Sequence, residues 1–332
     1  MENKFEFIND DLIINRESYN FFNDQNYVPV VYGVDGNFLM HAGVSILSFI
    51  ENANGVRFHF IVVTSCESKY ELSKFSNLLS DSLHALTVVV ISDVIFKLLP
   101  ATKTFTISVY FRLLVPIMFD HYKFILYVDA DIIAINSVSD LIQNNMPLNV
   151  ASCVVKEPRE QAKLSYDVGI DEGAYFNSGM MYINTEVWNE NSVSQKVYQC
   201  LIEKGASFKY FDQDALNIVL HDNVKFIESK YNKQIKAGHT KADMFFLPSC
   251  DTVLLHYVGK DKPWQKWNQQ RLSCYYKKYL AISPWRDVIF QNPTCSRDIK
   301  KYIKTLLYKK SYSVSILWFL RFLLALAAEK LK

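Results

Sequence analysis

The stretch Phe124-Ile-Leu-Tyr-Val-Asp129-Ala-Asp131 is a run of strand-forming apolar residues that ends in two carboxylates one residue apart. Side chains two positions apart on an extended segment point the same way, so both acids can face one ion where the strand leaves its sheet. Hard oxygen ligands favour Mg²⁺ or Mn²⁺. The stretch therefore predicts a buried strand that leads to a divalent-metal site suited to a diphosphate.

The Asp-x-Asp triplet alone is weak evidence, because a chain of this length contains roughly one by chance. A second triplet, Asp212-Gln213-Asp214, stands where a helix is predicted to start. An N-terminal cap whose acids complement the helix dipole explains that second triplet as well as a binding site does. The alternative for the first triplet is a pair of solvated acids at a strand end, but the preceding buried strand favours a site.

Around this stretch, strand-like segments alternate with helical spacings in a way typical of a parallel α/β sheet. The predicted strands cover residues 28–34, 57–64, 86–91 and 124–128, and helical segments lie between them. Ligands of such sheets bind at the carboxyl ends of the strands, where the winding direction reverses. Asp35 and the first Asp-x-Asp triplet are both expected on that rim.

Two common nucleotide-binding motifs are missing from the sequence. Neither the Gly-rich dinucleotide fingerprint nor the Gly-x-x-x-x-Gly-Lys-Ser/Thr loop occurs, which excludes a nicotinamide dehydrogenase and a P-loop nucleotidase. Further strands are predicted at residues 174–184, 224–228 and 252–257, with a helix over 212–220. Their irregular spacing predicts mixed strands that extend the same sheet, and not a second domain.

Composition places the chain among large globular proteins. Its 332 residues are 50% hydrophobic with only 10 Gly and 9 Pro, enough for one large core. The N-terminus is acidic and lacks the pattern of a signal peptide. The six cysteines are scattered without metal or disulfide spacing, so we expect them to be reduced in a cytosolic protein.

The positive charge is concentrated in the tail. Residues 296–332 hold nine Lys/Arg and two Asp/Glu, a net +7, which leaves −5 for residues 1–295 of a chain whose total is +2. This distribution argues against nucleic-acid binding by the body. The tail predicts an amphipathic basic anchor on anionic lipid, since an apolar segment of fifteen residues at 314–328 with Arg321 inside is too short to span a bilayer. A helix packed on the body is the alternative.

Four more residues are candidates for chemistry. His256 ends an apolar strand and could complete a metal site with the two acids, although a lone His there is more often structural. Lys262 offers a point charge to phosphate. Arg112, on an apolar helix, needs an anionic partner if it is buried. Asn177 within a strand is equally well explained as a core amide or a ligand contact.

Taken in order, these segments resemble glycosyltransferase family 8, the retaining GT-A glycosyltransferases, and within it the bacterial lipopolysaccharide core galactosyl- and glucosyltransferases. The resemblance runs from about Val31 to Trp285. The motifs that carry it are Tyr32-Gly-Val-Asp35-Gly-Asn37-Phe38, Thr102-Lys-Thr to Tyr110-Phe-Arg112, Leu126-Tyr-Val-Asp129-Ala-Asp131, Tyr175-Phe-Asn177-Ser-Gly179, Asp212-Gln213-Asp214-Ala-Leu-Asn217 and His256-Tyr-Val-Gly259 to Lys262-Pro-Trp264.

The resemblance implies a single GT-A domain at 28–282, preceded by a polar arm at 1–27 and followed by a basic helical extension at 283–332. It implies transfer of galactose or glucose from a UDP-sugar to the lipopolysaccharide core, at the cytoplasmic face of the inner membrane. Asp129, Asp131 and His256 would bind Mn²⁺ or Mg²⁺. The donor would be held by Gly33, Val34, Asp35, Asn37, Phe38, Arg112, Asp129, Ala130, Asn177, Gly259 and Lys262, and the catalytic group would be Asp212, Gln213 and, less firmly, Asp214.

The chain also departs from the family. Some relatives carry an Asp near the donor sugar, whereas here only Glu157 is near, out of register. A rival class is the haloacid-dehalogenase type of phosphohydrolase, which also uses a strand ending in Asp-x-Asp. That class has Thr or Val two residues after the second Asp, where this chain has Ile133. An inactive UDP-sugar-binding protein is the other alternative.

Overall fold

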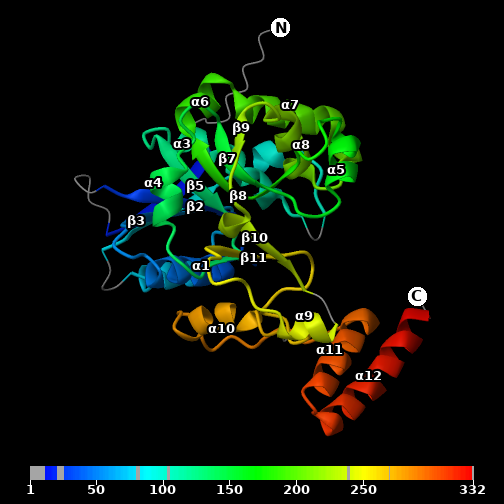
Figure 1. Ribbon diagram of the computed structural model, residues 1–332. Helices are drawn as coiled ribbons and strands as arrows, with labels where there is room; N and C mark the ends of the chain where they lie inside the picture. Colours follow the sequence, from blue (N-terminus) through cyan, green and yellow to red (C-terminus); the bar gives the residue numbers. More distant parts are fainter. Residues whose placement is uncertain are drawn as a thin grey trace.

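The computed structural model describes residues 12–20, 26–79, 83–102, 105–237, 240–268 and 270–330. Its core is an eight-stranded sheet with the order β1-β4-β3-β2-β5-β8-β7-β9, covered by helices on both faces (Figure 1). The strands are β1 (Ile13–Tyr19), β2 (Val28–Val34), β3 (Phe58–Thr64), β4 (Ala85–Ile91), β5 (Phe124–Val128), β7 (Ser152–Lys156), β8 (Phe176–Asn184) and β9 (Val224–Phe226).

The predicted parallel part of the sheet is confirmed. Strands β4, β3, β2 and β5 pair in parallel, and β2 lies between β3 and β5. The winding therefore reverses between β2 and β5, and this is where parallel sheets bind ligands. Asp35 follows β2 and Asp129 follows β5, so both lie at that point.

The remaining strands of the large sheet are mixed, as predicted, with one addition. Strand β8 runs antiparallel to both β5 and β7, and β9 pairs in parallel with β7. Strand β1 lies inside the segment predicted as a polar arm, and it pairs antiparallel with β4. Its sequence gave no strand signal because β1 lies at the sheet edge with nearly all of its side chains exposed. Residues 1–11 and 21–25 of the arm lie outside the described residues.

The placement of the strand that carries His256 was predicted wrongly. Strand β11 (Leu254–Val258) does not extend the large sheet but forms a second, three-stranded sheet with β10 (Lys233–Lys236) and β6 (Ile132–Ala134). Strand β6 follows β5 after three residues, so the chain passes from one sheet to the other through Asp129-Ala130-Asp131.

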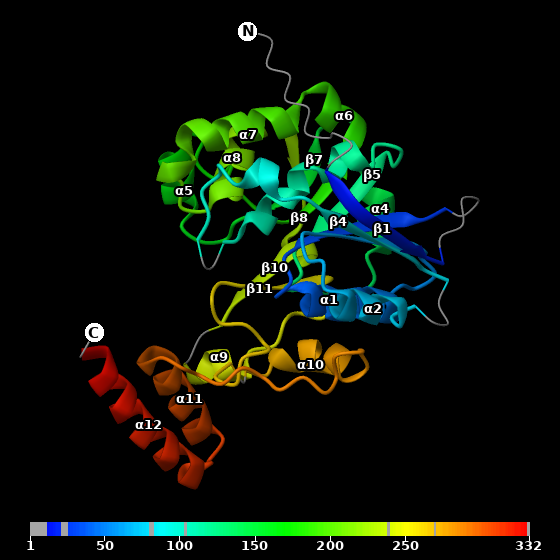
Figure 2. The ribbon, with the colours of Figure 1, turned by 180° about the vertical axis from the view of Figure 1, so that it is seen from behind.

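The large sheet and the helices on its two faces form three layers (Figure 2). Alternating residues of β2 point to opposite faces, Tyr32 into a core with α1, α2 and α10, and Val31 into a core with η2, α7 and α8. The apolar helix predicted around Arg112 is a 3-10 helix, η2 (Ile107–Leu113), followed by a short α3 (Val115–Met118). The other helices are α1 (Leu39–Glu51), α2 (Lys69–Ser76), η1 (Val94–Phe96), α4 (Ser139–Asn144), α5 (Gln161–Val168), α6 (Thr185–Glu190), α7 (Val193–Lys204), η3 (Gly205–Ser207), α8 (Phe211–Val219), η4 (Ser229–Asn232), α9 (Lys241–Phe245) and α10 (Ser273–Ala281).

The chain ends in a helical hairpin that projects from the body (Figure 1). Its helices, α11 (Ser296–Tyr308) and α12 (Tyr312–Lys330), pack together through a small cluster that includes Ile299, Leu306 and Trp318. Helix α12 has 19 residues and is longer than the predicted apolar segment. Its window Tyr312–Glu329 is long and apolar enough to cross a membrane. The prediction that this segment is too short to span a bilayer was therefore wrong.

Candidate metal and donor site

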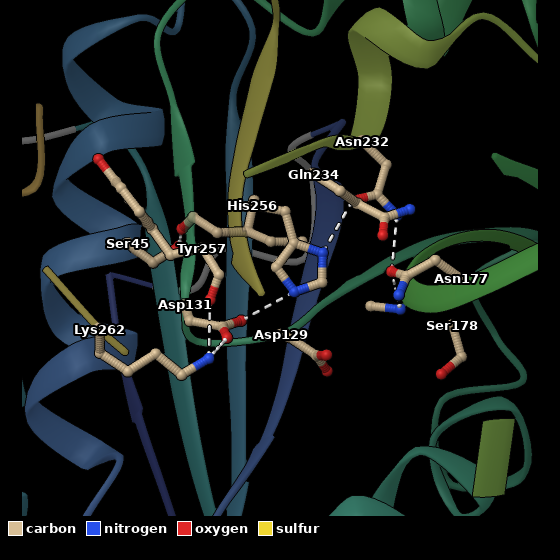
Figure 3. Close-up of polar contacts among 12 residues, drawn as sticks. Ser45, Asp129, Asp131, Asn177, Ser178, Asn232, Gln234, His256, Tyr257 and Lys262 are labelled. Atoms are coloured by element: carbon tan, nitrogen blue, oxygen red, sulfur yellow. Dashed lines mark hydrogen bonds and ion pairs between the residues drawn. The ribbon is translucent and has the colours of Figure 1, made fainter. Parts of the chain in front are cut away.

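The two acids and the histidine predicted as metal ligands lie together (Figure 3). Asp129 and Asp131 stand in the turn between β5 and β6, and His256 faces them from β11, where it pairs in register with Ile132. One ligand atom from each of the three lies within 4.8 Å of the others. His256 is in the middle of its strand, and not at its end as predicted.

Hydrogen bonds fix the state of the imidazole. The Nδ2 of Asn232 donates to Asn177 Oδ1 at 2.9 Å, so the oxygen of Asn232 faces His256 Nδ1, also at 2.9 Å. That oxygen can only accept, which assigns a proton to Nδ1, so the neutral imidazole carries its lone pair on Nε2. Since Nε2 is the atom that faces Asp131, His256 is prepared as a metal ligand.

The carboxylate of Asp131 fits the same interpretation. Its Oδ1 lies 3.2 Å from His256 Nε2, yet it is buried and has no hydrogen-bond partner in the described part of the chain. With the N–H of Nδ1 directed to Asn232, Nε2 and this Oδ1 are both free to act as ligand atoms. Burial alone would raise the pKa of Asp131, but the Lys262 ammonium on its other oxygen holds that pKa well below its usual value. A divalent cation between these atoms would satisfy both.

A glycine keeps the space beside these ligands open. A Cβ on Gly179 of β8 would lie 2.3 Å from His256 Cε1 and 2.9 Å from Asp129 Oδ2. Any side chain there would fill the site, so the donor set and the space both fit Mn²⁺ or Mg²⁺. Gly179 lies in one of the motifs, but only the tertiary fold shows that its missing side chain leaves this space.

Lys262 lies on the metal-ligand carboxylate. Its Nζ donates to Asp131 Oδ2 and, at 2.7 Å, to the carbonyl of Tyr257. The preceding Gly259 has φ +86, a conformation that glycine adopts without strain. The ammonium is thus within reach of any anion that approaches the three ligands.

Arg112 has the anionic partners that its burial requires. Its Nη2 lies 2.8 Å from Asp129 Oδ1 and its Nε 3.2 Å from Asp212 Oδ2, while Nη1 donates to the carbonyl of Ser178 at 2.7 Å. The guanidinium also lies over the ring of Tyr127. This side chain connects the first Asp-x-Asp triplet to the second.

The three residues of the second triplet have different environments. Burial raises the pKa of Asp212 to about 6, against the opposing effect of Arg112. Gln213 Oε1 accepts from Asn177 Nδ2 at 3.1 Å and from the Ser178 N–H at 3.0 Å. Asp212 is thus linked to Asp129 through Arg112, and Gln213 is linked to Asn177. Their catalytic role stays a prediction.

Asp214, by contrast, is buried and hydrogen-bonded to two tyrosines. It is 2% exposed, accepts from the Tyr175 hydroxyl and accepts from the Tyr210 N–H at 2.8 Å. Both of its oxygens are used where α8 starts. The N-cap of α8 is Tyr210, without a side-chain cap hydrogen bond, so the N-terminal cap considered for this triplet is not formed as predicted.

The end of β2 carries the residues expected to hold a nucleoside. Asp35 accepts from Thr106 Oγ1 at 2.7 Å and from the N–H of Asn37 at 2.9 Å, which fixes the turn before α1. A Cβ on Gly33 would lie 3.0 Å from Phe111 Cβ, so β2 packs closely on η2. The other members predicted here are buried Val34 and half-buried Phe38. Ala130, predicted as a further donor contact, is buried in the turn between β5 and β6. Lys103 and Thr104 of the second motif lie outside the described residues.

Glu157 contacts Asn177 although its sequence position is out of register. It is 7% exposed, its Oε2 lies 3.4 Å from Asn177 Nδ2, and its Oε1 lies 3.1 Å from Arg159 Nη2. The pairing of β7 with β8 shifts between Val154 and Val155, which brings Glu157 to Asn177. Asn232 was missed as well, since only the tertiary fold brings it to His256.

Comparisons with known proteins agree with this geometry. The sequence model described as Glycosyl transferase family 8 matches residues 29–268, and the model described as Glycosyl transferase family 8 C-terminal matches residues 272–325. The chain is 29% identical over 328 residues to the lipopolysaccharide 1,3-galactosyltransferase of Salmonella typhimurium, covering 96% of this chain and 97% of that protein. It is 30% identical over 294 residues to the lipopolysaccharide glucosyltransferase WaaO of Escherichia coli K12, covering 86% and 87%.

Solved structures show the same fold. The galactosyltransferase LgtC, in complex with donor and acceptor sugar analogs, superposes with a TM-score of 0.68 at 17% identity, covering 77% of this chain and 96% of that one. The bifunctional glycosyltransferase WbbM superposes with a TM-score of 0.66 at 20% identity, covering 80% and 51%. The fold is thus the GT-A fold that the sequence predicted. Since the first family model alone matches most of the length of this chain, the chain belongs to glycosyltransferase family 8.

Proposed function

We propose that this enzyme is a metal-dependent, retaining hexosyltransferase that moves galactose or glucose from a UDP-sugar to the lipopolysaccharide core. The observation that carries the proposal is the cluster of Asp129, Asp131 and His256, with Lys262 on one side and Arg112 on the other. The relatives named for lipopolysaccharide galactosyl and glucosyl transfer support the substrate class.

Asp129, Asp131 and His256 would hold Mn²⁺ or Mg²⁺. When bound, such an ion stabilises the negative charge that develops on the diphosphate as the sugar leaves. Lys262 would add a positive charge to the same group from the opposite side of Asp131. The turn after β2 would hold the uridine, with Asp35 kept in place by Thr106.

Retention is proposed to proceed by attack of the acceptor hydroxyl on the face that UDP leaves, with the departing phosphate taking the proton. Gln213 is a poor nucleophile, and two N–H donors already occupy its Oε1. Both oxygens of Asp214 already accept hydrogen bonds, one from Tyr175 and one from Tyr210. A covalent glycosyl-enzyme trapped on Asp214 in the unmodified protein would contradict this mechanism.

The test is UDP release from UDP-galactose and UDP-glucose, with and without Mn²⁺, on a defined truncated lipopolysaccharide. We expect metal-dependent release with one donor preferred, and its loss in Asp131→Asn. Donor binding without turnover on any acceptor would identify an inactive binding protein. Release of inorganic phosphate in place of UDP would identify a phosphohydrolase.

We also propose that the C-terminal hairpin attaches the enzyme to the cytoplasmic face of the inner membrane. Leu317, Leu320 and Leu324 of α12 are 53%, 56% and 71% exposed, and exposed lysines of α11 lie nearby in the hairpin. Apolar surface beside basic charge favours binding to anionic lipid. The triple change of these leucines to Gln should abolish sedimentation with phosphatidylglycerol vesicles, and undiminished sedimentation would refute the proposal.

A further inference from the structure

The loop that carries Lys262, residues 259–268, lies between the body and the C-terminal hairpin; we name it the diphosphate loop. On the body side, the ring of Trp264 stacks on His41 of α1 with centroids 3.6 Å apart and an interplanar angle of 17°. His41 Nδ1 is in turn 2.7 Å from the hydroxyl of Tyr276 of α10. This aromatic stack holds the middle of the loop against the catalytic domain.

On its other side, the loop is held by α11. Lys301 Nζ forms an ion pair with Asp261 Oδ2, and the two side chains are 20% and 14% exposed. The other oxygen of Asp261 accepts from Trp267 Nε1 at 3.0 Å. One turn further along α11, Thr305 Oγ1 donates to the carbonyl of Trp267 at 3.2 Å. The two ends of the loop are thus bonded to each other and to the same helix face.

These contacts lie next to the proposed donor site. Asp261 directly precedes Lys262, whose N–H donates to Gln265 Oε1 at 2.8 Å and whose Nζ reaches Asp131. The backbone of residue 261 therefore sets the point from which the Lys262 side chain extends. A small rotation at that point moves the ammonium away from the diphosphate position, because the side chain is long and flexible.

We infer that Lys301 is a positioning residue for the donor diphosphate, so that the C-terminal hairpin takes part in donor binding. The inference rests on the proposed function, since it assumes that Lys262 contacts the diphosphate. The pair is largely shielded from solvent, where such interactions are screened less than on the surface. The hairpin thereby has a role separate from attachment to lipid.

Calorimetric titration of the full chain with UDP and with uridine, both in Mn²⁺, tests the inference. Lys301→Met should weaken UDP binding by roughly 3- to 30-fold. It should leave uridine binding unchanged, because uridine lacks the diphosphate that Lys262 would contact. Lys301→Arg should restore most of the affinity, and Lys300→Met, a change at an exposed neighbour on α11, is the matched control.

A double-mutant cycle separates positioning from a merely structural role. In a chain that already carries Lys262→Met, adding Lys301→Met should cause no further loss of UDP affinity. Lys301 acts only through Lys262, so its effect disappears once Lys262 is replaced. Equal UDP affinity of Lys301→Met and Lys300→Met would overturn the inference. So would a loss that adds fully to that of Lys262→Met, or one that affects uridine equally.

Limited trypsin digestion reports on the loop without any ligand. Cleavage after Lys260 and Lys266 should be faster in Lys301→Met than in Lys300→Met, and equal rates would count against the inference. A wild-type chain that bound neither UDP nor uridine would instead overturn the proposed function. The digestion would still show whether α11 holds the loop.

Discussion

Replacing Asp212 by Asn should stabilise the protein at neutral pH while it impairs transfer. Burial raises the pKa of this carboxyl from 3.8 to about 6 in the folded chain. Between these pH values the folded chain binds more protons at Asp212 than the unfolded chain does, so folding stability falls as the pH rises. The penalty is absent below about pH 4 and complete above about pH 6.

The size of the effect follows from the same pKa. A rise from 3.8 to about 6 corresponds to roughly 3 kcal/mol of lost stability once the group is ionised. Asn keeps the shape of the side chain and removes the charge. Arg112 keeps the Asp129 carboxylate and the Ser178 carbonyl as partners, so it is not left unpaired in the variant.

Urea unfolding at several pH values between 4 and 7.5, with chelator present to remove metal, measures the difference. The free energy of unfolding of Asp212→Asn should exceed that of the wild type by roughly 2–3 kcal/mol at pH 7 and by almost nothing at pH 4. Asp167→Asn, a change at an exposed position on α5, is the control and should show no such trend. A variant that is less stable than the wild type at pH 7, or a difference independent of pH, would refute the reasoning.

Three further predictions concern close packing and the choice of donor sugar. Gly179→Ala places a methyl group 2.3 Å from His256 Cε1. Titration with Mn²⁺ in the presence of UDP should therefore show roughly tenfold weaker metal binding, and an unchanged metal affinity would contradict a metal site at these residues. Gly43→Ala places a methyl group 2.2 Å from Trp285 Cζ3 and should lower the free energy of unfolding by about 1–3 kcal/mol, which an unshifted urea midpoint would disprove. Glu157→Gln should change the ratio of kcat/KM for UDP-galactose and UDP-glucose by roughly tenfold without changing UDP affinity, and a constant ratio would exclude Glu157 from sugar selection.

The parts predicted from sequence are those with local signals. Strands β2 to β5 are apolar runs buried on both faces, so their composition identifies them. Strand β1 is polar and exposed, and β6 has only three residues, so neither has a usable periodicity. The second sheet joins segments more than 100 residues apart, and only the tertiary fold determines that pairing.

The site follows the same division. Asp129, Asp131 and His256 could be named because linked motifs carry them, and the structure brings them together. Asn232 carries no motif, and its role depends on where η4 places it against β11. The contact of Glu157 with Asn177 depends on a shift in strand register, and no pattern in the sequence predicts that shift.

The passage of the chain between its two sheets has a consequence for how this protein can change. Only three residues, 129–131, separate β5 from β6, and Ile132 must then meet His256 in register. Inserting or deleting one residue would turn every side chain of β6 to the opposite face. The length of this triplet is therefore fixed by the folding of both sheets as well as by chemistry, and loop grafts or permuted termini placed there should not yield folded protein.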